Sequence, residues 1–305
     1  MLSFKIVYFF QAGIGILANV FLLGFHIITF HQVHRPRPID ITTCKLAFVH
    51  LVMLFATMNI LSTDMMNSLN FPNELKCKLV LYIIRVTREL SISTTCLLSI
   101  VQVITISPSS FYLSRFKHKL TNYIIIAFLC LWSLNLSSNS YMIIYTVVHS
   151  NRSNLLNVNK YCSLSSMNSI IMVLFLTLSL FQKAFFIGMM LLCSMYMVVF
   201  LCSHQRKSEY LHSMSISPRI SPAKRATHTV LLLMSIFVIM YCVDITISSV
   251  STALWKYDPV ILGIQSLVEN VYATVSPLVF ISSDKRIIGL LQNVIDMLKS
   301  QQIDA

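Results

Sequence analysis

Long apolar runs with few charged residues recur along this 305-residue chain. The hydrocarbon core of a bilayer is about 30 Å thick, so a helix needs about 20 residues to cross it. The runs that reach this length span residues 6–30, 44–63, 78–106, 122–148, 169–202, 228–254 and 259–281. Although Asn135 and residues 137–140 interrupt the fourth run, such continuous stretches favour helices over the short alternating strands of a β-barrel. We therefore predict an all-α membrane protein, a single domain of residues 1–305 folded as a seven-transmembrane helix bundle.

Composition supports a membrane location. Hydrophobic residues make up 56% of the chain and charged residues only 11%, against about 25% charged residues in soluble domains. This leaves too little polar surface for a water-soluble globule. The net charge of +12 does not indicate a nucleic-acid partner, because the basic residues sit in short loops without interleaved aromatic side chains.

The basic loops predict how the bundle is oriented. When alternate loops are assigned to opposite sides, one set holds fourteen Lys and Arg residues and the other holds six. Cytoplasmic loops are the ones enriched in positive charge. We therefore expect a multi-pass protein of the plasma membrane with its N-terminus outside and its C-terminus inside, and with the first span serving as an uncleaved anchor.

A glycosylation site and a disulfide bond are expected on the outer side of the membrane. Asn151 begins an Asn-Arg-Ser glycosylation acceptor in the loop after the fourth span. Cys77 and Cys162 are the two cysteines that this topology places in the oxidising compartment, so we expect them to form a disulfide. The other cysteines are interpreted as small buried hydrophobic residues, and no metal site is expected because none of them is paired at ligand spacing.

Two segments on the inner side have a distinct character. Residues 203–227 form a polar linker rich in Ser and Pro, which is either a plain loop or a phosphorylation site. Ile287, Leu291 and Val294 then recur at helical spacing beside basic residues. This pattern predicts a short amphipathic helix over about 284–299 that lies against membrane lipids.

The sequence contains none of the common catalytic or nucleotide-binding motifs, so neither an enzyme nor a cofactor is expected. There is no Gly-rich phosphate loop, His-Glu-x-x-His or Gly-x-Ser-x-Gly pattern. A secondary transporter or channel of small solutes is the alternative to a receptor. Transporters build their sites from helices broken by Gly or Pro in matching halves, whereas this chain has 6 Gly, 8 Pro and no internal repeat. A charged pore ring or filter loop is not visible either.

Several short segments resemble landmarks of rhodopsin-like G-protein-coupled receptors in altered form. They are Gly-Ile-Leu-Ala-Asn at 15–19, Leu-Ala-Phe-Val-His-Leu at 46–51, Trp132 in the fourth span and Ser-Pro-Leu-Val-Phe at 276–280. His50 stands where such receptors usually carry an acidic residue, and the usual Asp-Arg-Tyr triplet is missing from the third span.

The altered positions resemble one branch of that superfamily, the vomeronasal type 1 receptors. Residues 93–99 and 104–110 are similar to the third-span signature of this family, and the Ser-Pro pairs at 217–218 and 221–222 and Thr-Val-Ser-Pro at 274–277 match as well. The resemblance covers nearly the whole chain. It implies a seven-helix receptor, a small pheromone-like ligand and an inhibitory-type heterotrimeric G protein as the intracellular partner.

Charged residues within the spans are the candidate ligand contacts, because a charge in lipid is unfavourable and turns toward the bundle interior. Our hypothesis is a polar floor beneath an apolar pocket in the outer half of the bundle. Its members are Arg85, Arg88, Glu89, Lys183, Asp244 and Glu269. The equally weighted alternative is that Arg85 pairs with Glu89 and Arg88 with Glu269 only to lock helices together.

Other residues have expected structural or partner-facing roles. His50 and Asn19 are expected to be hydrogen-bonded between helices, Trp132 to be a packing landmark, and Pro277 to kink the seventh span. Basic residues at the inner ends could line a cleft for the G protein, or could simply reflect membrane topology. These are Arg115, Lys117, Arg206 and Arg225.

Overall fold

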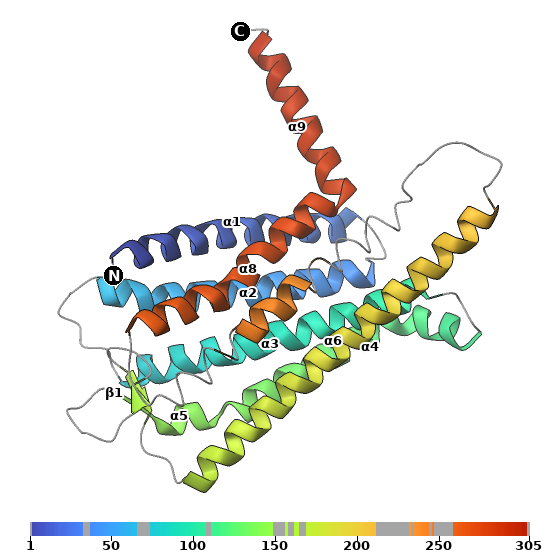
Figure 1. Cartoon of the computed structure of the whole chain (residues 1–305). Helices are drawn as coiled ribbons and strands as arrows, with labels where there is room; N and C mark the ends of the chain where they lie inside the picture. Colours follow the sequence, from blue (N-terminus) through green and yellow to red (C-terminus); the bar gives the residue numbers. More distant parts are fainter. Residues whose placement is uncertain are drawn as a thin grey trace.

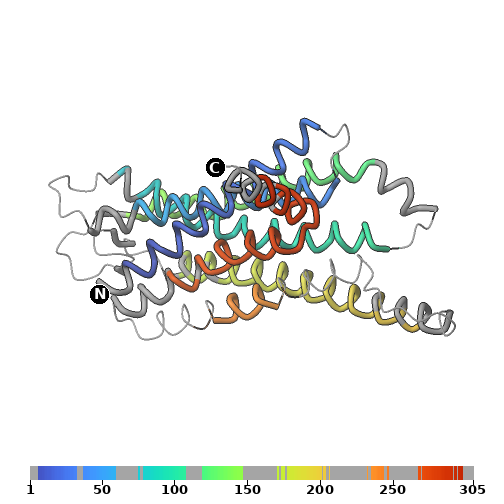
Figure 2. The backbone as a smooth tube through the Cα atoms, turned by 90° about the horizontal axis from the view of Figure 1, so that it is seen from above, coloured from blue at the N-terminus to red at the C-terminus, as the bar shows by residue number. Residues whose placement is uncertain are grey.

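The structure is a computed structural model that describes residues 2–32, 37–65, 74–107, 111–148, 156–157, 162–164, 169–211, 232, 235–243, 246 and 259–303. Its main helices run along one common direction, as two perpendicular views show (Figures 1 and 2). The helices are α1 (Leu2–Gln32), α2 (Pro38–Met65), α3 (Glu74–Ile106), α4 (Phe111–Ser138), α5 (Tyr141–Tyr145), α6 (Ser169–Leu211), α8 (Pro259–Ser283) and α9 (Lys285–Ile303). Residues 235–243 are also helical.

Five helices among the described residues are long and apolar enough to cross a membrane. The candidate spans are Ile6–Gln32, Pro38–Asn59, Lys78–Ile106, Lys119–Tyr145 and Val173–Phe200. The predicted fold class, an all-α membrane protein, is therefore confirmed. Helical residues 235–243 lie within the predicted span 228–254, and α8 covers the predicted span 259–281. The count of seven spans stays a prediction.

The fourth predicted span, residues 122–148, is interrupted near its outer end. Helix α4 stops at Ser138, the short α5 follows, and residues 146–148 form a strand. Asn139 Nδ2 donates to the Asn135 carbonyl at 2.9 Å, and Ser140 Oγ donates to the Ser137 carbonyl at 2.8 Å. Short polar side chains that take over backbone carbonyls in this way compete with the helical ladder and end it.

A small antiparallel sheet caps the end of the bundle at which the N-terminus lies (Figure 1). Its strands are β1 (Thr146–Val148), β2 (Leu156–Asn157) and β3 (Cys162–Leu164), in the order β1-β3-β2. Val148 is paired with Cys162. The side chains of Cys77 and Cys162 and the whole of Asn151 lie outside the described residues, so the disulfide and the glycosylation site stay predictions.

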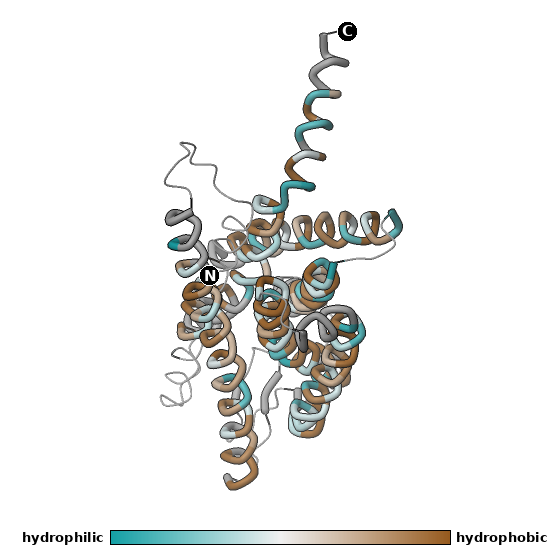
Figure 3. Tube along the Cα trace, turned by 90° about the vertical axis from the view of Figure 1, so that its right-hand side faces the viewer, coloured by the Kyte–Doolittle hydropathy of each residue, from teal (hydrophilic) through white to brown (hydrophobic). Residues whose placement is uncertain are grey.

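Helix α3 occupies the centre of the bundle. In its membrane-spanning window 67% of the residues are buried, against 17% in α4 and 22% in α6. The outer helices instead expose large apolar side chains such as Phe10, Leu17, Phe181 and Leu192, and brown, hydrophobic positions follow these helices in Figure 3. An exposed apolar surface of this kind suits contact with lipid tails.

Helices α1, α2 and α8 approach one another closely at Gly15. A Cβ atom at this position would lie 2.8 Å from Thr274 Oγ1 and 2.9 Å from Leu54 Cδ1. Nearby, Asn19 Nδ2 donates to the Ala273 carbonyl at 2.9 Å, which joins α1 to α8. Small residues at such contacts let helix backbones pack closely in a membrane.

An ion-pair cluster fixes the junction between α8 and α9. Arg286 donates to both carboxylate oxygens of Asp40 on α2, at 2.8 and 3.0 Å, and its Nη2 contacts Asp284 at 2.7 Å. Burial opposes ionisation of Asp284, but the hydrogen bonds from Arg286 outweigh it and lower the pKa of Asp284. The carboxylate therefore stabilises the junction at neutral pH, and this contribution is lost as the pH falls through the lowered pKa.

Helix α9 leaves this junction at a steep angle to the bundle (Figures 1 and 3). It begins one residue after the start of the predicted amphipathic segment 284–299 and ends four residues beyond it. Ile287 is fully buried against Leu22 and Ala47, whereas Ile295 and Met297 are exposed. Its contact with lipid stays a prediction.

Replacing Gly15 by Ala should destabilise the bundle, because the added methyl group would push α1 away from Thr274 and Leu54. The expected loss is about 1 to 3 kcal/mol. Gly13→Ala is the matched control, since it gains the same helix propensity and a Cβ there meets nothing within 4 Å. Thermal unfolding of the purified chain checks this, and equal midpoints for the two variants would refute the close contact.

Candidate functional site

A buried ion pair joins α3 to α6 in the half of the bundle that carries the sheet. Lys183 Nζ lies 3.2 Å from Glu89 Oε1, and the two side chains are 9% and 3% exposed. Arg85, one turn earlier on α3, brings its Nε to 3.9 Å from the same oxygen. The structure thus gathers three of the six predicted polar-floor residues.

The other three are not brought into this group by any described contact. Arg88 is half-buried on α3 and does not line the pocket described below. Glu269 belongs to α8, but its side chain lies outside the described residues, as does all of Asp244. The proposed pairing of Arg88 with Glu269 therefore stays a prediction.

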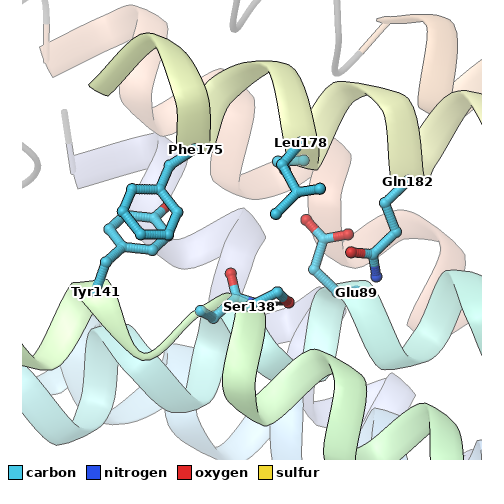
Figure 4. Close-up of a pocket in the computed structure, with 8 residues that line it drawn as sticks. Glu89, Ser138, Tyr141, Phe175, Leu178 and Gln182 are labelled. Carbon is cyan, nitrogen blue, oxygen red and sulfur yellow. Dashed lines mark hydrogen bonds between the residues drawn. The ribbon is translucent and has the colours of Figure 1, made fainter. Parts of the chain in front are cut away.

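A small pocket opens beside Glu89 between α3, α6 and the turn that links α4 to α5 (Figure 4). Its lining residues are Glu89, Ser138, Asn139, Tyr141, Phe175, Leu178, Ser179 and Gln182. The rings of Tyr141 and Phe175 stack with their centroids 4.5 Å apart. The free space inside admits about one water molecule. Larger guests can enter only if these side chains move.

Polar side chains continue from the pocket toward the centre of the bundle. Gln182 Nε2 donates to Asn135 Oδ1 at 3.0 Å, and Asn135 Nδ2 donates to Ser93 Oγ at 3.4 Å. The predicted site residues did not include Gln182, Asn135, Tyr141 and Phe175, which lie in or beside the pocket. The two amides carried a usable signal, because a polar side chain in a lipid span seeks partners on neighbouring helices.

His50 on α2 links three helices. Its Nε2 lies 2.8 Å from Ser91 Oγ on α3, and its Nδ1 lies 3.2 Å from Ser276 Oγ on α8. The ring also meets Tyr272 edge to face at 5.4 Å, and the Tyr272 hydroxyl lies 3.1 Å from Thr95 Oγ1. His50 is thus hydrogen-bonded to two neighbouring helices.

The other residues with predicted structural roles are Asn19, Trp132 and Pro277. Asn19 Nδ2 donates to the carbonyls of Gly15 and Ala273, so its described bonds run to the backbone rather than to His50. Trp132 packs against a buried cluster on α2 and α3, and Pro277 lies inside α8 next to Ser276.

An aromatic cluster lies between the pocket and the opposite end of the bundle. Phe237 packs against Tyr272 at 4.5 Å and Tyr241 at 4.8 Å, together with Cys96, Met190 and Met197. The cluster therefore joins α3, α6, α8 and residues 235–243. Among the described residues there is no group of three or more His, Cys, Asp or Glu that could hold a metal ion.

Of the four basic residues predicted at the inner ends of the helices, only Arg206 has a described side chain. Arg206 is exposed near the end of α6. Arg115 and Lys117 lie on α4 with side chains outside the described residues, and Arg225 falls wholly outside them. No cleft can be built from these four residues, and their role stays a prediction.

Removing one partner of the Glu89–Lys183 pair should destabilise the chain more than removing both. Glu89→Gln and Lys183→Met each leave a buried charge without this counter-ion, which costs about 3 to 5 kcal/mol, whereas a neutral pair can pack without that penalty. A double-mutant cycle read from thermal unfolding measures the coupling. Strictly additive losses would show that the two side chains do not interact.

Comparisons with known proteins agree with this architecture. The model of the vomeronasal organ pheromone receptor family matches residues 2–293. Vomeronasal type-1 receptor 90 of Rattus norvegicus is 41% identical over 292 residues, which cover 95% of this chain and 93% of the relative. Vomeronasal type-1 receptor 51 of Mus musculus is 38% identical over 290 residues, covering 94% and 90%. The resemblance drawn from the third-span motif is thereby confirmed, and the chain belongs to the vomeronasal organ pheromone receptor family.

Proposed function

We propose that this chain is a pheromone-sensing receptor that couples binding of a small extracellular ligand to activation of an intracellular heterotrimeric G protein. The pocket beside Glu89 is the ligand site in this proposal. The G protein is of the inhibitory type, as the family resemblance implies. The chain sits in the plasma membrane as a seven-pass bundle with its N-terminus outside.

The observation that carries the proposal is the buried Glu89–Lys183 pair at the wall of a pocket near the sheet-bearing end. Charged residues within membrane spans are rare and usually have a functional role, because a charge in lipid is energetically unfavourable. The pocket faces the end of the bundle that the Lys and Arg distribution assigns to the outside. A ligand from that side reaches it by displacing the Tyr141–Phe175 stack.

Signalling requires a ligand that binds the active arrangement better than the resting one, because equal affinity for both shifts nothing. In our proposal the ligand changes the contact between α3 and α6. The aromatic cluster around Phe237 passes this change to residues 235–243 and to α8. A rigid displacement at the inner end then exposes a surface for the G protein.

The partner surface in this proposal contains Arg206 and the other three inner basic residues, Arg115, Lys117 and Arg225. Their positive charge suits an acidic surface on the partner. Membrane lipids contact the apolar outer faces and α9.

The deciding experiment is a screen of small molecules and urinary extracts on cells that express the chain with a G protein and a calcium readout. A response that disappears when the G protein is blocked supports the receptor. Solute uptake or ionic current that persists without the G protein would contradict it and support a transporter or channel.

Charge reversal at the inner face should separate binding from signalling. We expect Arg206→Glu, combined with reversal of Arg115, Lys117 and Arg225, to abolish G-protein activation while ligand binding stays within about twofold, because Arg206 lies near the opposite end of α6 from the pocket-lining residues and the other three are predicted on the same inner side. A variant with Lys at all four positions is the matched control and should preserve activation. Full activation by the reversed variant would show that the charges only set topology.

A further inference from the structure

Helix α6 continues beyond the end of α3 at the side of the bundle that the Lys and Arg distribution assigns to the inside. Helix α3 ends at Ile106, whereas α6 runs on to Leu211. Two perpendicular views show the last part of α6 reaching past α3 (Figures 1 and 2). Cys202 and Arg206 are exposed there. We call residues 197–211 the α6 extension, and Arg206 of the proposed partner surface lies on it.

A hydrogen bond joins α3 to α6 where the α6 extension begins. Ser107 Oγ lies 2.8 Å from the Tyr196 hydroxyl oxygen. Ser107 directly follows α3, and its backbone N–H donates to the Val103 carbonyl at 2.9 Å. The Tyr196 ring stacks on Phe200, one turn further along α6, with the ring centroids 6.4 Å apart. Both side chains are thus positioned by contacts with their own segments.

Ser107 differs from hydroxyl residues earlier on α3. Thr87 and Thr105 donate to carbonyls of their own helix, at 2.7 and 2.9 Å. Pro108 follows Ser107 in the sequence, and the residue before a proline disfavours the helical conformation. The side chain of Ser107 therefore stands at the end of the helix, where it bonds to α6.

Apolar side chains fill the α3–α6 interface between this hydrogen bond and the ion pair at the pocket. They include Cys96 and Ile100 of α3 and Met190 of α6. Hydrophobic contact is non-directional and methionine side chains adapt their shape, so this packing tolerates small shifts of one helix against the other. The Ser107–Tyr196 bond is directional. It therefore fixes the position of α6 at the point where the extension leaves α3.

The Ser107–Tyr196 bond opens more readily than the ion pair. It is exposed, whereas the side chains of Glu89 and Lys183 are 3% and 9% exposed. Separating a buried ion pair leaves charges away from water, which is strongly unfavourable. A hydrogen bond between neutral groups shifts an equilibrium by only about twofold to tenfold. A ligand with a modest preference for the open arrangement is therefore sufficient to release it.

We propose that the Ser107–Tyr196 hydrogen bond is a latch that keeps the α6 extension against the end of α3 in the resting receptor, and that its opening frees the extension for the G protein. This inference rests on the proposed receptor function and adds a device that regulates it. With the bond formed, the inner ends of α3 and α6 stay together and cover the surface between them. With the bond broken, the two ends separate, and the released hydroxyls bond to water at the membrane surface.

The test removes each hydroxyl in turn and measures activity without any ligand. Tyr196→Phe keeps the ring stack on Phe200, and Ser107→Ala removes the other partner. The matched control is Thr105→Val, which deletes a nearby hydroxyl whose described bond runs to the Gln102 carbonyl of its own helix. The readout is basal nucleotide exchange on a purified inhibitory-type heterotrimer by the full chain in lipid nanodiscs, expressed per folded receptor.

Each single latch variant should raise basal exchange about twofold to tenfold, because the open arrangement becomes more populated. The double variant S107A/Y196F should be no more active than either single variant, since the same bond is lost in all three. Thr105→Val should leave basal exchange unchanged. Three results overturn the proposal: no rise in the two single variants, an equal rise in Thr105→Val, or a double variant whose effect is the product of the single effects.

Amide hydrogen exchange of the same samples without G protein separates this proposal from the receptor function. Residues 103–107 and the start of the α6 extension should exchange faster in Tyr196→Phe than in Thr105→Val, because the helix ends part more often. If the rates are equal while a urinary extract still activates the G protein through the chain, only the latch is wrong. If exchange is faster but neither the variants nor any extract activates a G protein, the coupling proposal fails instead.

Discussion

The polar side chains of α3 must find their partners inside the bundle, because lipid tails offer none. Glu89 pairs with Lys183 on α6, Ser91 with His50 on α2, and Thr95 with Tyr272 on α8. One central helix is thereby tied to three others along its length. The rest of the arrangement, including the pocket and the small-residue contact at Gly15, depends on these ties holding the helices in register.

The same constraint explains how one site can influence distant helices. The pocket lies against the α3–α6 ion pair, and the His50 and Tyr272 contacts follow within two turns along α3. The hydrogen bond of His50 to α8 ends at Ser276, which directly precedes Pro277. A proline has no backbone N–H group to donate to the helix. A change at Glu89 can therefore reach Pro277 on α8 through a short series of contacts.

The sequence supported prediction of some elements and not others, for physical reasons. Span lengths follow from hydropathy, and Glu89 and Lys183 were found because charges in lipid are conspicuous. The sequence showed that residues 137–140 interrupt the fourth run, but it did not predict that the helix ends at Ser138, because hydropathy averages over the competition between short polar side chains and the helical ladder. The contacts of Gln182 with Asn135 and of Arg286 with Asp40 depend on which helices face each other, which periodicity along one helix does not contain.

The most direct test compares two buried hydroxyls on α3 by thermal unfolding in lipid nanodiscs. Ser91 bonds to His50 on another helix, whereas the described bonds of Thr87 run only to carbonyls of its own helix. If interhelical polar contacts hold the bundle together, Ser91→Ala lowers the unfolding midpoint by several degrees more than Thr87→Val. Equal shifts, or a larger shift for Thr87→Val, would contradict the central role of these contacts.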